Sequence, residues 1–70
     1  MDIVERLKIE DRLRNKGVAR VSKYRFTCND GLVYAEPSVD GFENPMTFDT
    51  FTHLCLEAID YAERNKKRRG

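Results

Sequence analysis

Between residues 24 and 36 the chain reads YRFTCNDGLVYAE, and this segment has the pattern of a β-hairpin. Apolar Tyr24, Phe26 and Cys28 alternate with polar residues, as in a strand that buries one face. Gly31 then supplies the positive φ that a tight connection needs, before β-forming residues resume. The segment therefore predicts two antiparallel strands joined by a short turn.

Two registers of this hairpin fit the sequence. A two-residue turn at residues 30–31 pairs Arg25 with Glu36 on the outer face. A three-residue turn with a bulge sets Phe26 opposite Tyr34 instead. The difference decides whether Tyr34 is buried or exposed, because a slip of one residue exchanges the faces of a strand. We favour the two-residue turn, since it brings Arg25 and Glu36 together.

A helix is expected before the hairpin, over residues 2–16. Asp2 and Glu5 have the spacing of a capping box, and Gly17 is placed to end the helix in the left-handed conformation. The apolar residues fall on two sides of this helix: Ile3, Val4 and Leu7 on one, Ile9 and Leu13 on the other. Either its own domain packs on both sides, or one stripe is buried and the other is offered to a partner.

A second helix is expected after a loop over residues 37–46 that is rich in Pro, Gly and Asn. Thr47 is a suitable N-cap, and Asp49 suits the first turn of the helix. Leu56 falls on the polar side of this helix and is expected to be exposed. The apolar arc comprises Phe51, Leu54, Cys55, Ala58, Ile59, Tyr61 and Ala62.

These elements predict an α+β fold of helix, antiparallel hairpin and helix (αββα), with both helices on one face of a small sheet. We expect one domain over residues 1–63, followed by a basic helix end or tail over residues 64–70. With 70 residues, 36% of them charged, and no long apolar run, the chain is expected to be soluble and cytoplasmic, without a membrane partner.

Catalytic and metal-binding patterns are not evident in the sequence. Cys28 and Cys55 each fall at an apolar position, so both are expected to be buried, free thiols. The zinc-ligand spacings Cys-x-x-Cys and His-x-x-x-His do not occur, and Asp49, His53 and Glu57 on one helix side make a poor cation site. We therefore expect no catalytic residues, no cofactor and no metal.

The net charge of +1 conceals a segregation of charge along the chain. Residues 1–35 carry eight cations and five acids, residues 36–63 carry seven acids and no Lys or Arg, and residues 64–70 carry five cations. Such a field would act on association with a charged partner. Alternatively the charges only solvate the surface, with pairs at i, i+4 such as Asp60 with Arg64 and Glu63 with Lys67.

Leu56 is predicted to project among charged residues on the acidic helix. It would then be an apolar anchor for a larger protein, in a surface that also includes Asp49, His53, Asp60 and Glu63. On this basis the sequence favours a small non-enzymatic interaction module: a regulator, adaptor or inhibitor. Phages and other mobile elements often encode such short chains. An uncovered hairpin edge is also compatible with a homodimer.

Nucleic-acid binding is the second prediction. Lys23 and Arg25 alternate on the outer face of the hairpin, and Tyr34 would join them in one of the two registers. The basic end could follow a phosphate backbone through Lys66, Lys67, Arg68 and Arg69. Against this interpretation stand the seven acids between the basic regions and the near-neutral pI of about 7.8.

Overall fold

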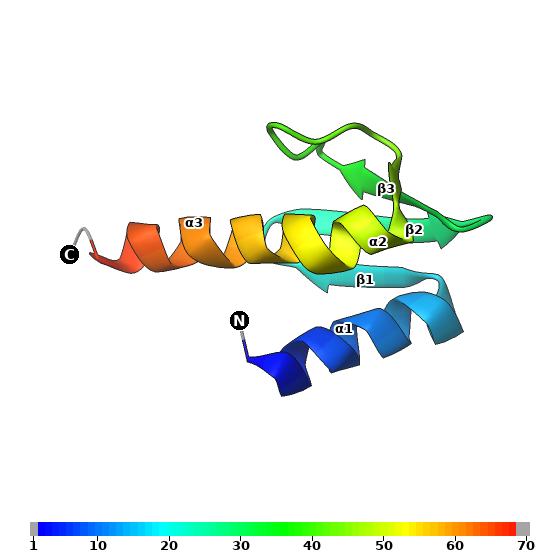
Figure 1. Ribbon diagram of the computed structural model, residues 1–70, viewed down its shortest axis with the longest axis horizontal. Coiled ribbons are helices and arrows are strands. Elements are labelled where there is room, and N and C mark those ends of the chain that lie inside the picture. Colours follow the sequence, from blue (N-terminus) through cyan, green and yellow to red (C-terminus); the bar gives the residue numbers. More distant parts are fainter. Residues whose placement is uncertain (1, 69–70) are drawn as a thin grey trace.

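In a computed structural model, a four-stranded antiparallel sheet in the order β1-β2-β3-β4 follows one helix along the chain and precedes a C-terminal helical segment (Figure 1). The structure describes residues 2–68, with side chains up to residue 65. The elements are α1 (Ile3–Lys16), β1 (Val18–Val21), β2 (Tyr24–Asn29), β3 (Leu32–Glu36), β4 (Met46–Thr47), α2 (Phe48–Thr50), the π-helical turn η1 (Phe51–Cys55) and α3 (Leu56–Arg68). The α+β class is confirmed. The αββα order is wrong in its strand count, because two further strands flank the predicted hairpin.

The central hairpin has the favoured register. Arg25 lies opposite Glu36, and their side chains form an ion pair at 2.7 Å. Asp30 and Gly31 both have positive φ, 60° and 78°, as a two-residue turn of this kind requires. Tyr34 is therefore on the outer face of the sheet, where it is exposed.

Strand β1 escaped the sequence analysis because its turn lacks the Gly, Asn or Asp that usually supplies a positive φ. Ala19 and Val21 alternate inward, and β1 pairs with β2 through a connection at Ser22 and Lys23. Ser22 adopts a φ of 57°, a conformation that sequence rules assign mainly to Gly, Asn or Asp. Tertiary packing thus produces a turn where local propensity does not predict one.

Strand β4 is only two residues long and pairs with the start of β3. Beyond it, the Asn44 side chain continues the ladder: its amide donates to the Ala35 carbonyl at 2.8 Å, and its carbonyl accepts from the Ala35 N–H at 2.9 Å. The backbone of Ala35 therefore obtains its hydrogen bonds from a loop side chain in place of a strand, so the sequence shows no periodic pattern here.

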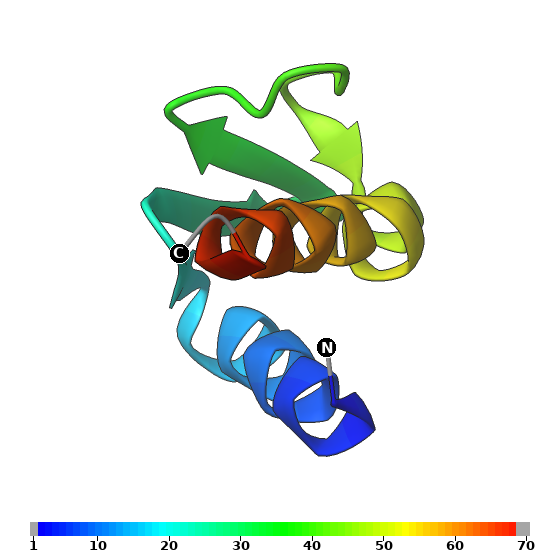
Figure 2. The ribbon, with the colours of Figure 1, turned by 90° about the vertical axis from the view of Figure 1, so that its left-hand side faces the viewer.

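The core lies between one face of the sheet and the helices. Phe26 of β2 and Phe51 of η1 are fully buried, with ring centroids 4.7 Å apart, and Leu13 brings α1 into the same cluster. Figure 2 looks nearly along α3 and shows the sheet curving past one side of this helix, with α1 next to β1. The other face of the sheet, including Arg25 and Tyr34, is open to solvent.

The turn η1 changes which side of the C-terminal helix is buried. The Leu56 N–H donates to the Phe51 carbonyl, an i→i+5 bond that adds one residue to the turn. Every later residue is consequently turned back by about one position, or about 100°. Leu56 and Ile59 thus point into the core, whereas Leu54 and Tyr61, which the sequence placed on the apolar arc, are exposed.

The ends of α1 agree only partly with the prediction. As predicted, Gly17 ends the helix in the left-handed conformation, with a φ of 80°. Its N–H donates to the Leu13 carbonyl. The predicted capping box is wrong, because the Asp2 side chain makes no capping hydrogen bond.

Within the described part of the chain, neither long helix has the length and apolar character needed to cross a membrane.

Candidate interaction surfaces

The predicted binding surface around Leu56 does not form. Leu56 is 0% exposed, because η1 turns it into the core. Of its predicted neighbours, Asp60 forms an ion pair with Arg64 at 2.8 Å, and Glu63 accepts a hydrogen bond from the Ser22 hydroxyl. Leu56 is therefore a core residue, and Asp60 and Glu63, predicted beside it, contact other residues of the chain.

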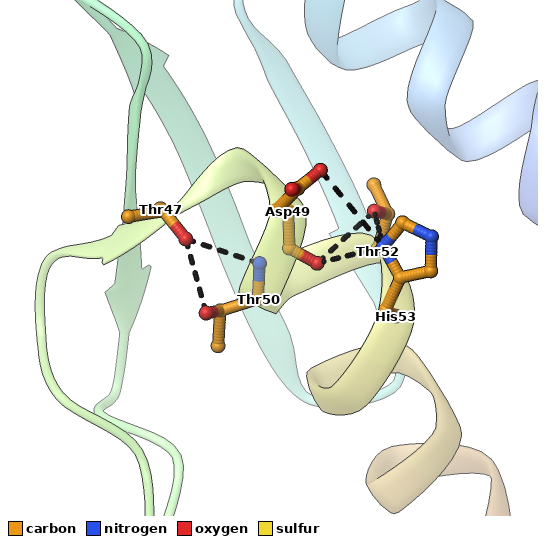
Figure 3. A network of polar contacts seen from close by, with 5 residues as sticks. All are labelled: Thr47, Asp49, Thr50, Thr52 and His53. Atoms are coloured by element: carbon orange, nitrogen blue, oxygen red, sulfur yellow. Dashed lines mark hydrogen bonds and ion pairs between the residues drawn. The ribbon is translucent and has the colours of Figure 1, made fainter.

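Asp49 and His53 take part in a polar network at the start of the C-terminal helical segment (Figure 3). The Thr50 N–H donates to the Thr47 hydroxyl at 3.1 Å, so Thr47 is the N-cap that the sequence predicts. The Asp49 carbonyl accepts from the Thr52 hydroxyl at 3.2 Å and lies 3.1 Å from His53 Nδ1. These contacts satisfy the backbone of the first turn, which is a structural role.

Two ion pairs join cations of the first segment to acids of the second. Arg6 of α1 donates to Glu57 of α3, and Arg25 pairs with Glu36, so cations of the first segment neutralise acids of the second. The predicted i, i+4 pair of Asp60 with Arg64 is present. Segments that are far apart in the sequence thus cancel each other's charge where they meet in the fold.

The residues predicted to bind nucleic acid are largely engaged or undescribed. Arg25 is paired with Glu36, and the Lys23 ammonium lies 5.5 Å from the centroid of the Tyr24 ring. Arg69 and the side chains of Lys66, Lys67 and Arg68 lie outside the described residues. The described structure therefore brings only Lys23, Arg25 and exposed Tyr34 to the hairpin.

The N-terminal half of α1 has three exposed large apolar side chains, more than any other described element. Ile3, Val4 and Leu7 are 66%, 54% and 54% exposed, and their i, i+1, i+4 spacing places them along one side of the helix. We call them the apolar α1 face. Leu13 anchors the opposite side in the core, so of the two sequence alternatives the structure has the one with one stripe buried and the other exposed.

A second surface on α1 was missed by the sequence analysis. On another flank of the helix, a hollow of about 320 Å³ lies between α1 and the edge strand β1, and we call it the basic hollow. Its cations are Lys8, Arg12 and Arg20. The four-residue spacing of Lys8 and Arg12 is visible in the sequence, but Arg20 joins them only because β1 folds back beside α1.

The two cysteines are free thiols, as expected. Cys55 is fully buried, and burial raises the pKa of its thiol to about 11, which keeps it protonated and unreactive at neutral pH. Cys28 is half-buried. Among the residues that the structure describes, no group of three or more His, Cys, Asp or Glu is placed to hold a metal ion.

Comparison with known proteins finds no match, whether to a protein-family model, to a curated protein or to a solved structure.

Proposed function

We propose that this chain is a small, cytoplasmic, non-enzymatic interaction module that regulates or inhibits a larger protein, and that it contacts this protein through the apolar α1 face. The observation that carries the proposal is the exposure of Ile3, Val4 and Leu7 on a helix whose other side is already anchored in the core. Apolar side chains gathered on one exposed helix side are typical of protein contact sites.

The attachment of α1 to the rest of the protein supports this proposal. Leu13 is fully buried and Ile9 is partly buried against the core, so packing is concentrated in the C-terminal half of the helix. Towards the N-terminus the described side chains offer the Arg6–Glu57 ion pair, and Figure 1 shows this end of α1 diverging from α3. The apolar α1 face therefore lies on a part of the helix that the described core does not hold.

The test is capture from a lysate of the source cell, with and without nuclease and at two salt concentrations. The bait is the wild-type chain, the double variant Ile3→Ser/Leu7→Ser, or the control Leu54→Ser, which alters an exposed leucine on another surface. We expect a protein that the wild type and the control retain and the double variant loses. Equal recovery with all three baits would contradict the proposal.

Light scattering on the purified chain tests whether a second copy of the chain, and not a different protein, covers the apolar α1 face. If the chain is a dimer that Ile3→Ser/Leu7→Ser converts to a monomer, the apolar α1 face is a self-association surface, and the proposal of a larger partner is wrong. A monomer in both forms leaves the face free for a different protein. The homodimer that the sequence permits is decided by the same measurement.

A further inference from the structure

The basic hollow holds cations that the fold does not use for its own stability. Within the part of the chain whose side chains are described, Lys8, Arg12 and Arg20 form no ion pair or hydrogen bond. Glu5 is the one acid that lines the hollow, and the Glu63 carboxylate lies beside it on the Ser22 hydroxyl, so three cations outnumber two acids. The hollow is therefore electropositive.

Other arginines of α1 are engaged in contacts, which makes these free cations distinctive. Arg6 pairs with Glu57, and the Arg14 guanidinium lies 4.7 Å from the centroid of the Phe48 ring. Lys8 and Arg12, in contrast, are like charges at i, i+4, an arrangement that destabilises a helix. Arg20 of β1 adds a third charge to the same hollow. This clustering opposes folding, and an anionic ligand would offset it.

We propose that the basic hollow binds a ligand with several phosphate groups. The guanidinium groups of Arg12 and Arg20 come from two elements, and each presents a planar fork that matches phosphate oxygens. Lys8 adds a third donor group, and Ile9 and Val21 provide apolar lining. The Ser22 hydroxyl donates to Glu63, so phosphate recognition rests on the three cations.

The row of cations continues beyond the hollow. Lys16 lies four residues after Arg12 on the same flank of α1, about 6 Å further along the helix axis. A chain of phosphates therefore meets more positive charge than a single phosphate does. Both a small polyphosphate and a nucleic-acid backbone have this chemistry. The basic hollow is on a different flank of α1 from Leu7, so the inference does not depend on the proposed protein partner.

The experiment compares two double variants that each remove two positive charges. Arg12→Gln/Arg20→Gln removes the two forks of the hollow, whereas Arg14→Gln/Arg64→Gln removes two exposed arginines elsewhere. Binding of pyrophosphate is followed through the backbone amide NMR shifts of residues 8–20, and binding of a labelled oligonucleotide of about 15 nucleotides through fluorescence anisotropy, both at low salt. Circular dichroism checks that all variants remain folded.

We expect at least one probe to bind the wild type and the control, and Arg12→Gln/Arg20→Gln to weaken that binding by about tenfold. A fourfold rise in salt concentration should weaken oligonucleotide binding by about 20-fold if three phosphates are contacted. Binding of pyrophosphate identifies a small-ligand site, and binding of the oligonucleotide alone identifies a backbone site. Equal loss in both double variants would reduce the effect to net charge and overturn the proposal, as would no binding of either probe.

Discussion

The two helical segments differ in how many of their apolar side chains they bury in the core. In the C-terminal segment, η1 adds one residue to a turn, and the helix beyond it buries Leu56 and Ile59. Helix α1 is a regular helix from Ile3 to Lys16 and buries Leu13 alone. Ile3, Val4 and Leu7 remain in solvent.

The C-terminal helix thus has its apolar side covered by the core, whereas the apolar α1 face stays exposed to solvent. A helix that packs along its length on a sheet obtains a single buried side, here through a local change of helical geometry. Helix α1 packs mainly at one end, so among the described residues no core contact covers Ile3, Val4 or Leu7. We therefore expect a partner to bind α1 and not the acidic helix that the sequence suggested.

The largest expected effect is that of a charge at Leu56. Leu56→Asp places a carboxylate in the core and should cost at least about 3 kcal/mol, which is most of the stability of a domain of this size. Thermal denaturation followed by circular dichroism should show a largely unfolded chain, whereas Leu54→Asp, at an exposed position, should melt like the wild type. An unchanged melt for Leu56→Asp would mean that η1 does not turn this side chain inward.

Deletion of one residue tests η1 itself. Removing exposed Leu54 converts the turn to a regular α-helical one and keeps Leu56 and Ile59 inward, so we expect a folded protein. Removing Ala58 instead forces either Leu56 or Ile59 out of the core, at a cost of about 2–5 kcal/mol. Urea unfolding of the two deletions should differ accordingly, and equal stabilities would refute this account of the helix.

A smaller effect is expected at the end of α1. Gly17→Ala should cost about 1 kcal/mol, because Gly17 has a φ of 80° and no neighbouring atom crowds the position. Gly17→Asn should cost less, since Asn tolerates this conformation better. Urea unfolding measures both values. If the two variants were equally stable, the left-handed cap would not be what limits this position.

The smallest effect on stability is expected on the apolar α1 face. Leu7→Ser should change the free energy of unfolding by no more than about 0.5 kcal/mol, because Leu7 is already half exposed. The free energy of unfolding of Leu13→Ser, which removes a fully buried side chain, should be measured in parallel. The two values compare the two sides of one helix. A loss at Leu7 as large as that at Leu13 would show that the outer side is packed in solution.

Features that depend only on residues close together in the chain could be predicted from the amino-acid sequence. The period-two alternation, the Gly17 cap and the Thr47 N-cap are local, and local backbone preferences are sufficient to specify them. The two-residue turn at Asp30-Gly31 was favoured over a bulged turn only through the cross-strand pair of Arg25 with Glu36. The strands β1 and β4 could not be predicted in the same way. A turn at Ser22 and an edge completed by the Asn44 side chain are stabilised by the rest of the sheet.

The candidate surfaces depended still more on the tertiary structure. The sequence identified the two-sided pattern of α1, but placed the anchor at Leu56, because a regular helix of about 3.6 residues per turn leaves that residue outside. The π-helical turn η1 reversed this assignment. The basic hollow requires Arg20 to lie beside Lys8 and Arg12, and only the packing of β1 next to α1 brings these charges together. Local chemistry specifies where elements begin and end, whereas their orientation and their neighbours follow from burying one shared core.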